Sequence, residues 1–359
     1  MILRNAVRYN TFVAIISHKI LIPKTNSIMR KLKSFVLMTL FVSTSLLTSC
    51  SSNDDLKEGD SSITKNIEIM NFASRKNMQD KIDEIIALKN EKEIIASAEF
   101  IKSNKYVNSQ EQKLSADEIL IAELKKYHTN VLNNIYDLRE QIGFISIQSI
   151  ADEINSLNLI NPAKANELKI KYKSLLTEYQ HLTVTIFDER LANVINLNGE
   201  VIVNGEKDFL IKNSQNITGK YLRDESVNSG VAASSGNLTI YYSAGREVHE
   251  NDLGFKFYRY YTQLSAIAIV YTGFIPTFVP VPVTYNVDSG SLAGFVQVNS
   301  NPFSDYAFTY DYISGFGPSV RNTGGKSNTL YKPAGGNLSA TFITSYTTLT
   351  CNLKYNEIP

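Results

Sequence analysis

Apolar residues recur at helical spacing in the first part of the chain, from Ile63 to about Tyr179. Positions three and four residues apart lie on one face of an α-helix, so such a stripe predicts a helix that buries one side. The clearest stripes are Met78, Ile82, Ile85 and Ile86, then Ile119, Leu124, Tyr127, Val131, Leu132, Ile135 and Leu138, and then Ala165, Leu168, Tyr172, Leu175 and Tyr179. The pattern predicts a helical bundle or array.

Two sequence signals indicate where predicted helices begin. The motif Ser115-x-x-Glu118 is a capping box, in which the two side chains accept hydrogen bonds from backbone N–H groups at the helix start. The pair Asn161-Pro162 fits an N-cap followed by a first-turn proline. We expect a shorter helix from about Ser149 to Leu157 and another after Asp188.

The period changes in the segment Ile195–Ile211, INLNGEVIVNGEKDFLI, where apolar and polar residues alternate. Alternation is typical of half-buried strands, and Asn204-Gly205 between two such runs predicts a tight hairpin turn. We therefore predict a helical domain with a terminal hairpin over 63–212. The polar stretch 213–236 is the predicted linker.

From Asn237 onward the chain has short apolar runs separated by turn residues every eight to twelve positions. Regular spacing of short strands favours an all-β sandwich or small barrel over 237–359, so the predicted fold class is α+β. The expected turns lie at Gly245, Asp252-x-Gly254, Gly273, Ser289-Gly290, Asn301-Pro302, Gly315-x-Gly317, Gly324-Gly325 and Gly335-Gly336.

The N-terminus carries the pattern of a bacterial lipoprotein signal. A basic segment begins at Arg30, the apolar run Phe35–Leu47 is too short to span a bilayer, and the lipobox Leu47-Thr48-Ser49-Cys50 follows. Acylation of Cys50 would anchor the mature chain by several acyl chains without a spanning helix. We expect translation to begin at Met29, which makes 1–28 an upstream mis-start, 29–49 a signal peptide and 50–62 an acidic tether.

Three phrases resemble a group of bacterial proteins. They are Phe72-x-Ser74, Gly143-Phe144-x-Ser146 and LANVINLNGEV at Leu191–Val201. Over about half of the chain they are similar to uncharacterised surface-exposed lipoproteins of Bacteroidota, in which a phrase close to A-x-x-L-N-x-x-G-E-I-x-V-G-D follows a helical region. Here Asn204-Gly205-Glu206 stands where that phrase has Gly-Asp. The resemblance implies an outer-membrane, surface-exposed lipoprotein, and it carries no activity.

The net charge and the two cysteines bear on whether the protein binds nucleic acid and whether it forms a disulfide. The precursor has 36 Lys and Arg against 35 Asp and Glu, but seven of the basic residues lie before Cys50, so the mature chain has 29 against 35 and a net charge of −6. That balance does not favour a nucleic-acid partner, which wants a basic patch. If Cys50 carries lipid, Cys351 has no cysteine to pair with, and we expect it to be a small buried residue.

No motif predicts catalysis, a cofactor or a bound metal. Gly324-Gly325-Lys326-Ser327 lacks the earlier glycine of a phosphate loop, because that position is Val320, and we predict a turn between strands. His249-Glu250-Asn251-Asp252 has metal-ligand types, but position 253 is Leu where a zincin needs a second histidine, so we predict a solvated turn. Gly290-Ser291-Leu292-Ala293-Gly294 places its serine one position too early for a nucleophile elbow.

A row of four aromatic residues offers two interpretations. Tyr306, Phe308, Tyr310 and Tyr312 alternate with other residues, so they would share one face of a strand. We predict that this face belongs to the core, since buried strand faces are usually apolar. The alternative is an exposed platform on which a sugar ring or a partner stacks.

The stretch between Arg259 and Asp288 contains no charged residue. A membrane-inserting hairpin of a pore former would have such a run. Pro276, Pro280 and Pro282 instead favour a buried hairpin with an edge or extended strand, because each proline removes a ladder donor.

These observations predict a lipid-anchored outer-membrane or cell-surface protein with a binding or adhesion role. Its expected partners are the membrane, through the lipid on Cys50, and a glycan or protein ligand. A glycan or peptide hydrolase and a pore-forming, toxin-like protein remain the alternatives. A hydrolase would need a cleft with converging acids or histidines, whereas a binder would show an open aromatic patch.

Overall fold

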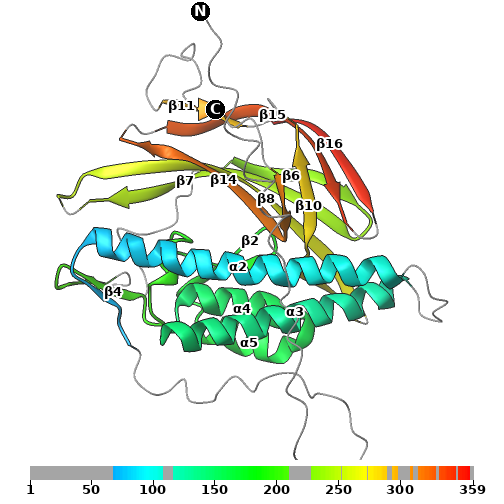
Figure 1. Cartoon of the computed structure of the whole chain (residues 1–359), viewed down its shortest axis with the longest axis horizontal. Helices are drawn as coiled ribbons and strands as arrows, with labels where there is room; N and C mark the ends of the chain where they lie inside the picture. Colours follow the sequence, from blue (N-terminus) through cyan, green and yellow to red (C-terminus); the bar gives the residue numbers. More distant parts are fainter. Residues whose placement is uncertain are drawn as a thin grey trace, which may run out of the picture. The chain divides into compact units, whose positions relative to one another are not determined.

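A computed structural model describes residues 68–107, 116–209, 228–251, 253–272, 274–288, 293–297, 308–309, 314–328, 331–344 and 347–355. The described N-terminal part is helical, with α2 (Arg75–Val107), α3 (Ala116–Ile142), α4 (Ile147–Ile160) and α5 (Pro162–Lys171). These helices lie along one another in Figure 1. The helical prediction is confirmed over 75–171.

Side-chain caps fix two helix starts. The Ser146 hydroxyl accepts a hydrogen bond from Ser149 N at 3.1 Å, so α4 begins two residues before the predicted start. The Asn161 side chain accepts a hydrogen bond from Lys164 N at 3.1 Å, with Pro162 in the first turn of α5, as predicted. The Ser115 capping box lies outside the described residues.

Two helix predictions after α5 are wrong. The chain leaves the helix at Lys171 and forms an antiparallel hairpin of β2 (Leu176–Tyr179) and β3 (Leu182–Thr185). The turn residues Gln180 and His181 have φ of 48° and 65°. The segment Leu182–Thr185 is rich in β-branched residues, which favour strands. After Asp188 there is only a short 3₁₀ helix, η1 (Leu191–Asn193).

The hairpin at Asn204-Gly205 is confirmed. Strands β4 (Glu200–Val203) and β5 (Glu206–Phe209) pair with Val203 opposite Glu206. Asn204 and Gly205 have φ of 56° and 75°, as the two-residue hairpin turn requires, and these are the residue types that tolerate such angles best. A short strand, β1 (Asn71–Phe72), runs parallel to β4 and completes a three-stranded sheet.

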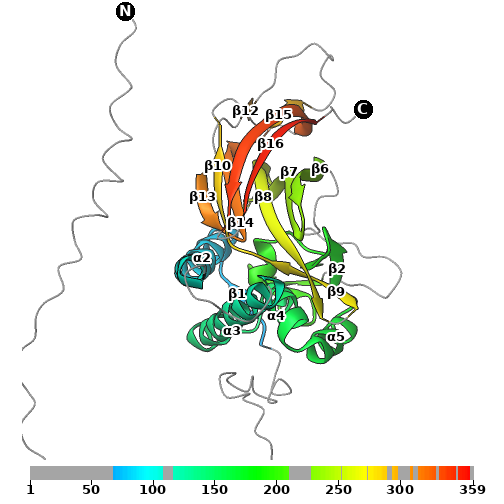
Figure 2. The same ribbon diagram turned by 90° about the vertical axis from the view of Figure 1, so that its right-hand side faces the viewer.

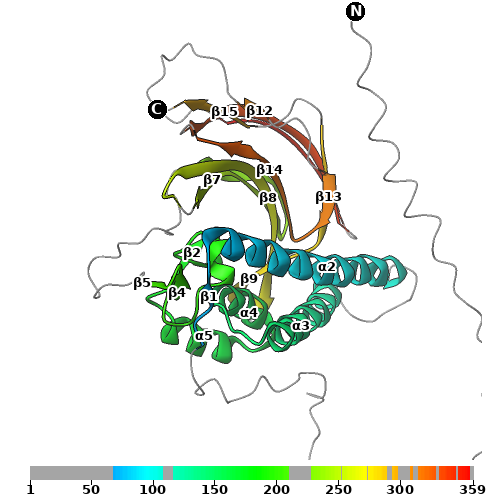
Figure 3. The same ribbon diagram turned by 60° about the vertical axis from the view of Figure 1, so that its left-hand side comes forward.

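The described C-terminal part forms two larger antiparallel sheets, so the chain is α+β, as predicted. The C-terminal end of the predicted linker, residues 228–235, belongs to a strand. One sheet has the order β14-β8-β7-β6 with β9 paired to β8, and the other has the order β12-β11-β15-β10-β13 with β16 paired to β15 (Figure 3). The strands are β6 (Asn228–Ser235), β7 (Leu238–Glu250), β8 (Lys256–Thr272), β9 (Ile275–Pro280), β10 (Val283–Val287), β11 (Ala293–Gln297), β12 (Phe308–Thr309), β13 (Ser314–Gly317), β14 (Ser319–Ser327), β15 (Tyr331–Ile343) and β16 (Thr348–Tyr355).

Three predicted glycine turns are wrong, because they lie inside strands. Gly245 is in β7, Gly324-Gly325 is in β14 beside a register shift, and Gly335-Gly336 is in β15. At Gly245 the reason is a close ring contact: an added Cβ would lie 2.6 Å from the hydroxyl oxygen of Tyr261 on the neighbouring strand. A glycine in a β-rich sequence can therefore mark a strand position on which an aromatic ring packs, as well as a turn.

One hydrophobic core joins the helices to both large sheets. It contains buried residues of the helices, such as Phe100 and Leu124, together with Leu264 of β8 and Phe342 of β15. Cys351 is 4% exposed in this core, which confirms its prediction as a small buried residue. A second core lies among the helices, η1, β1 and β4. Figure 2 shows α2, α3 and α4 beside the sheets.

The uncharged run forms the β8–β9 hairpin. As the prolines predict, β9 pairs with β8 alone in the described sheet, so it is an edge strand. Val279 is fully buried, whereas Phe274 and Ile275 near the turn are 102% and 69% exposed. Within the described residues, none of the helices has the length and apolarity that a membrane span needs.

Candidate functional site

Most sequence-predicted site residues lie outside the described part of the chain. This holds for Cys50 and for Tyr306, Tyr310 and Tyr312 of the aromatic row. Phe308 is placed in β12, with its backbone opposite Phe295, but its side chain is not described. The core and platform interpretations of this row both stay predictions.

The predicted solvated turn is wrong for His249, which lies in β7 with its side chain 9% exposed, and the turn begins only at Asn251. The ring of His249 lies 2.9 Å from the Gln79 side-chain oxygen through Nδ1 and 3.4 Å from Glu247 through Nε2. The Asn251 side chain accepts hydrogen bonds from Leu253 N and Phe255 N, as in an Asx turn. The described residues contain no group of three or more His, Cys, Asp or Glu that could hold a metal.

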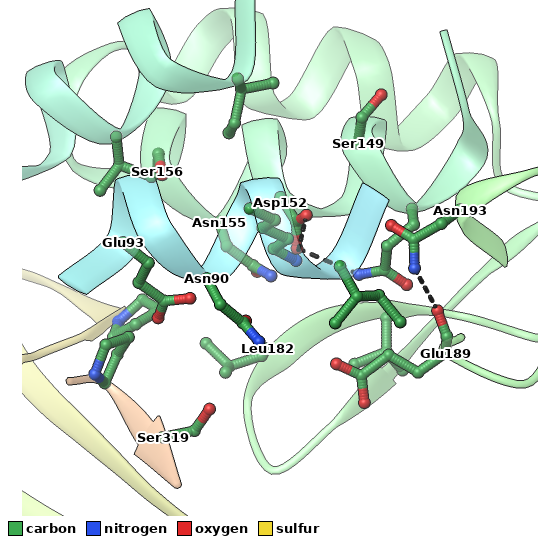
Figure 4. Close-up of a pocket in the computed structure, with 18 of the residues that line it drawn as sticks. Asn90, Glu93, Ser149, Asp152, Asn155, Ser156, Leu182, Glu189, Asn193 and Ser319 are labelled. Carbon is green, nitrogen blue, oxygen red and sulfur yellow. Dashed lines mark hydrogen bonds and ion pairs between the residues drawn. The ribbon is translucent and has the colours of Figure 1, made fainter. Parts of the chain in front are cut away.

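A cavity of about 620 Å³ lies between the helices and the β7–β8–β14 sheet, and we call it the helix–sheet cavity. Its walls come from α2, α3 and α4, from the β2–β3 hairpin and from the sheet strands that face them. In Figure 4, Asn90 and Glu93 project from α2 toward Ser319 of β14. The volume is within the usual range for small-molecule sites.

Paired charges form one wall of this cavity. The guanidinium of Arg321 donates to Glu247 at 2.8 Å, to Glu189 at 2.9 Å and to the side chain of Gln263 at 3.1 Å. A second guanidinium, on Arg190, lies 3.5 Å from Glu247. These contacts join three strands of the sheet, β7, β8 and β14, to the segment between β3 and η1 and fix the position of this wall.

Two further effects act on this ion-pair network: the Arg321 guanidinium stacks on an aromatic ring, and the Glu247 carboxyl is buried. The Arg321 guanidinium carbon lies 3.9 Å from the centre of the Tyr261 ring, which is the ring that covers Gly245. Burial alone would raise the pKa of the Glu247 carboxyl, but the His249 hydrogen bond and the charges of Arg321 and Arg190 outweigh it and lower that pKa. Glu247 is 2% exposed, so it is a buried carboxylate with two cationic partners.

The α2 side of the cavity has one carboxylate that is paired and one that is not. The Lys89 ammonium lies 2.6 Å from Asp152 of α4. Glu93 is one helical turn after Lys89, and among the described residues no hydrogen bond or ion pair reaches its carboxylate. Protein surrounds Glu93, yet its side chain keeps some accessible surface, because that surface faces the cavity.

Burial is the main cause that raises the pKa of the Glu93 carboxyl. The negative charges of Asp152 and Glu189 raise it further, while the positive charge of Lys89 opposes them. An uncompensated buried carboxylate is costly, so it either takes up a proton or pairs with a cation.

The neighbouring His128 is a neutral, fixed side chain. Its Nε2 lies 3.0 Å from the carbonyl oxygen of Pro280, which can only accept, so Nε2 carries the proton. Nδ1 is then the acceptor for the Ser156 hydroxyl at 3.4 Å. Burial lowers the pKa of His128 to about 4, partly opposed by the hydrogen bond to Pro280, so the ring is uncharged near neutral pH.

The hairpin wall is attached to α4 by one amide side chain. The Asn155 side chain donates to the carbonyl of Thr183 at 2.8 Å and accepts from the Thr183 N–H at 2.9 Å. It thus makes the two hydrogen bonds that the backbone of a paired strand would make. The buried hydroxyl of Thr183 has no hydrogen-bond partner in the described chain, and Thr183 lines the cavity. A buried hydroxyl without a partner costs about 1–3 kcal/mol.

A second cavity, of about 790 Å³, lies beside His249. Its polar groups are largely engaged with one another: Asp83 pairs with Arg190, and Gln79 contacts His249. The helix–sheet cavity is the stronger candidate, because the Glu93 side chain lines it and its carboxylate has no partner among the described residues.

Comparisons with known proteins give one distant neighbour. No protein-family model and no curated protein matches the chain. Among solved structures, the chain is similar to a DUF4848 family protein from Bacteroides thetaiotaomicron, with 11% sequence identity and a TM-score of 0.20 over 66% of this chain and 93% of that one. The likeness assigns no activity to the chain.

Sequence reasoning did not find the cavity residues. Lys89 and Glu93 look like an ordinary i,i+4 charge pair on a helix surface. Arg321 stands shortly before Gly324-Gly325, which resembles part of a phosphate loop and is the more conspicuous motif. The available signal was weak. Arg321 is a lone cation in an otherwise uncharged stretch from Ile313 to Gly325, and such residues are often paired when buried.

Proposed function

We propose that the protein is a lipid-anchored cell-surface binding protein that takes a small polar ligand into the helix–sheet cavity. The observation that carries this proposal is the cavity of about 620 Å³ whose walls are fixed by ion pairs while Glu93 projects into it without a partner. Pre-formed cavities with a few convergent polar groups are the usual form of ligand sites.

The experiment is a ligand screen on the soluble form Ser51–Pro359, with monosaccharides, amino acids and small amines, followed by isothermal titration. A ligand present at 100 times its Kd should stabilise the fold by about 2.7 kcal/mol. The blocking variant is Ser319→Tyr, because Ser319 lines the cavity and is exposed there, so that a phenol would occupy the space between Ser319 and Glu93. We expect this variant to fold and to lose ligand binding.

The matched control is Ser174→Tyr, which adds the same ring at an exposed position after α5. It should leave binding unchanged. Ligands that bind the Ser319→Tyr variant as tightly as the wild type would show that they bind elsewhere, and the cavity proposal would fail.

The proposed location rests on Cys50 and its flanking signal. Cys50→Ala should leave the protein unlipidated, so it should appear in the soluble fraction and incorporate no labelled palmitate. Labelling that survives this substitution would contradict the anchoring proposal.

A hydrolase acting on a glycan or a peptide is the second candidate. Burial raises the pKa of the Glu93 carboxyl, and a carboxyl with a raised pKa is the kind of group that general acid catalysis uses. Turnover of a bound compound that Glu93→Gln abolishes, with binding retained, would favour this candidate over a simple binding protein.

We also propose that the two large sheets form one sandwich, which the shared core of Leu264 and Phe342 supports. The predicted boundaries of a helical domain at 63–212 and a β domain at 237–359 stay predictions.

A further inference from the structure

We propose that the ligand of the helix–sheet cavity carries a protonated amine, which pairs with the carboxylate of Glu93. This inference rests on the proposed function and adds the chemical class of the ligand. It assigns a recognition role to one side chain of α2 that the fold leaves without a partner.

Three of the carboxylates around the cavity have a cationic partner, and Glu93 does not have one among the described residues. Asp152 has Lys89 at 2.6 Å, Glu189 has Arg321 at 2.9 Å, and Glu247 has Arg321 at 2.8 Å. For Glu93 the described residues provide no such contact. Lys89 is the cation of the described chain whose charge acts on it, and that ammonium is already bound to Asp152.

The surroundings of Glu93 suit an ammonium better than a second carboxylate or a phosphate. Two further negative charges, on Asp152 and Glu189, act on it. The rings of Tyr127 and Tyr285 are also near, since its charge adds to burial in raising the pKa of both phenols. Carboxylates with neutral aromatic rings are a common environment for amine recognition.

The hydroxyl of Tyr285 donates its hydrogen bond to the carbonyl of Pro318 at 2.9 Å. This phenol therefore does not donate a hydrogen bond to the carboxylate of Glu93. In Figure 4 the Glu93 side chain points into the same space as Asn90, with Ser319 across the cavity. An amine in this space would lie beside the Glu93 carboxylate, with the amide of Asn90 and the hydroxyl of Ser319 around it. The second part of the ligand is therefore expected to be polar and uncharged, as in an amino sugar or an amino alcohol.

The pH dependence follows from the same groups. The charged or titratable neighbours that act on Glu93 are Lys89 on α2, Asp152 on α4 and Glu189 before η1, together with the two phenols on α3 and β10. Burial raises the pKa of Glu93, and a bound ammonium would lower it again. Amine affinity should therefore increase as the pH rises through the pKa of the Glu93 carboxyl in the empty protein.

The test uses two pairs of probes that differ in one charge: glucosamine with glucose, and 4-amino-1-butanol with 1,4-butanediol. Isothermal titration measures all four against the soluble form Ser51–Pro359, Glu93→Gln and Glu91→Gln. Glu91 is the matched control, because it lies on the same helix and is exposed. We expect at least one amine to bind more tightly than its neutral partner. Glu93→Gln should weaken that amine about tenfold or more, as loss of a charge-assisted hydrogen bond does.

A second measurement separates recognition from a structural role. Removing an uncompensated buried carboxylate should leave the melting temperature of the empty Glu93→Gln variant equal to or above that of the wild type. A marked drop in melting temperature would mean that Glu93 supports the fold, and it would overturn the inference.

Three further outcomes would overturn it. Neither amine binds the wild type, or each amine binds no more tightly than its neutral partner, or Glu93→Gln and Glu91→Gln bind the amine equally. If one of these three outcomes occurs while a neutral probe binds the wild type and Ser319→Tyr blocks that binding, the cavity proposal stands and the amine inference fails.

Discussion

Replacement of Glu247 by Ala is expected to lower the free energy of unfolding by about 3–5 kcal/mol, because it leaves buried positive charge without its partner. Glu247 is 2% exposed and bonded to Arg321 at 2.8 Å, with Arg190 at 3.5 Å. Without this carboxylate, the ion pairs left among the described residues are Arg190 with Asp83 and Arg321 with Glu189. Urea unfolding monitored by circular dichroism measures the loss.

The same carboxylate predicts an acid-sensitive fold. The pKa of Glu247 is lower in the folded chain than in the unfolded chain, so its stabilising contribution is present above the unfolded value. That contribution is lost as the pH falls below the ordinary range of a glutamate toward the folded value. The wild type should therefore lose stability in acid more steeply than the Glu247→Ala variant.

The matched control is Glu178→Ala on β2, where the side chain is exposed and the expected change is within about 0.5 kcal/mol. Equal effects of the two substitutions would contradict a buried ion-pair network in this position.

Replacement of Leu124 by Ala should lower the stability of the helices and of the sheets together, by about 2–5 kcal/mol. Leu124 on α3 is fully buried, and its core also contains Val279 of β9 and Phe342 of β15. A cavity at this point removes contacts from both parts. Far-ultraviolet circular dichroism reports the helices, and the near-ultraviolet signal, in a chain without tryptophan, includes the tyrosines of β7, β8 and β10 in the sheets.

We expect both signals to shift to the same lower denaturant midpoint. The control, Ile95→Ala on α2, removes a side chain that is 54% exposed and should change the midpoint little. A loss confined to the helical signal would instead mean that the two parts unfold independently, as separate domains at 63–212 and 237–359 would.

Local patterns determined a large part of this fold. The helical stripes, the Asn161-Pro162 start and the Asn204-Gly205 turn depend on backbone geometry and on neighbours within a few residues, and the structure has each of them. The edge position of β9 follows likewise from its prolines, which cannot donate to a ladder. The same kind of local reasoning predicts the lipid on Cys50.

Sequence patterns gave the wrong secondary structure where a contact with a distant part of the chain determines the conformation. The stripe that ends at Tyr179 has helical spacing, but that segment pairs with Leu182–Thr185 to form a hairpin, which Asn155 holds on α4. Gly245 resembles a turn residue in the sequence, yet it is a strand position under the ring of Tyr261.

The helix–sheet cavity could be recognised only in the tertiary structure. Lys89 and Glu93 are neighbours on one helix and would be expected to pair with each other. In the fold, Asp152 of α4 lies 2.6 Å from the Lys89 ammonium and takes that role, which leaves the Glu93 carboxylate to the cavity. The sequence by itself determined which residues form the helices and the strands of the hairpin. The packing of α4 and the sheet against α2 decided which charge was left without a partner, because ion pairs depend on distances between residues far apart in the chain.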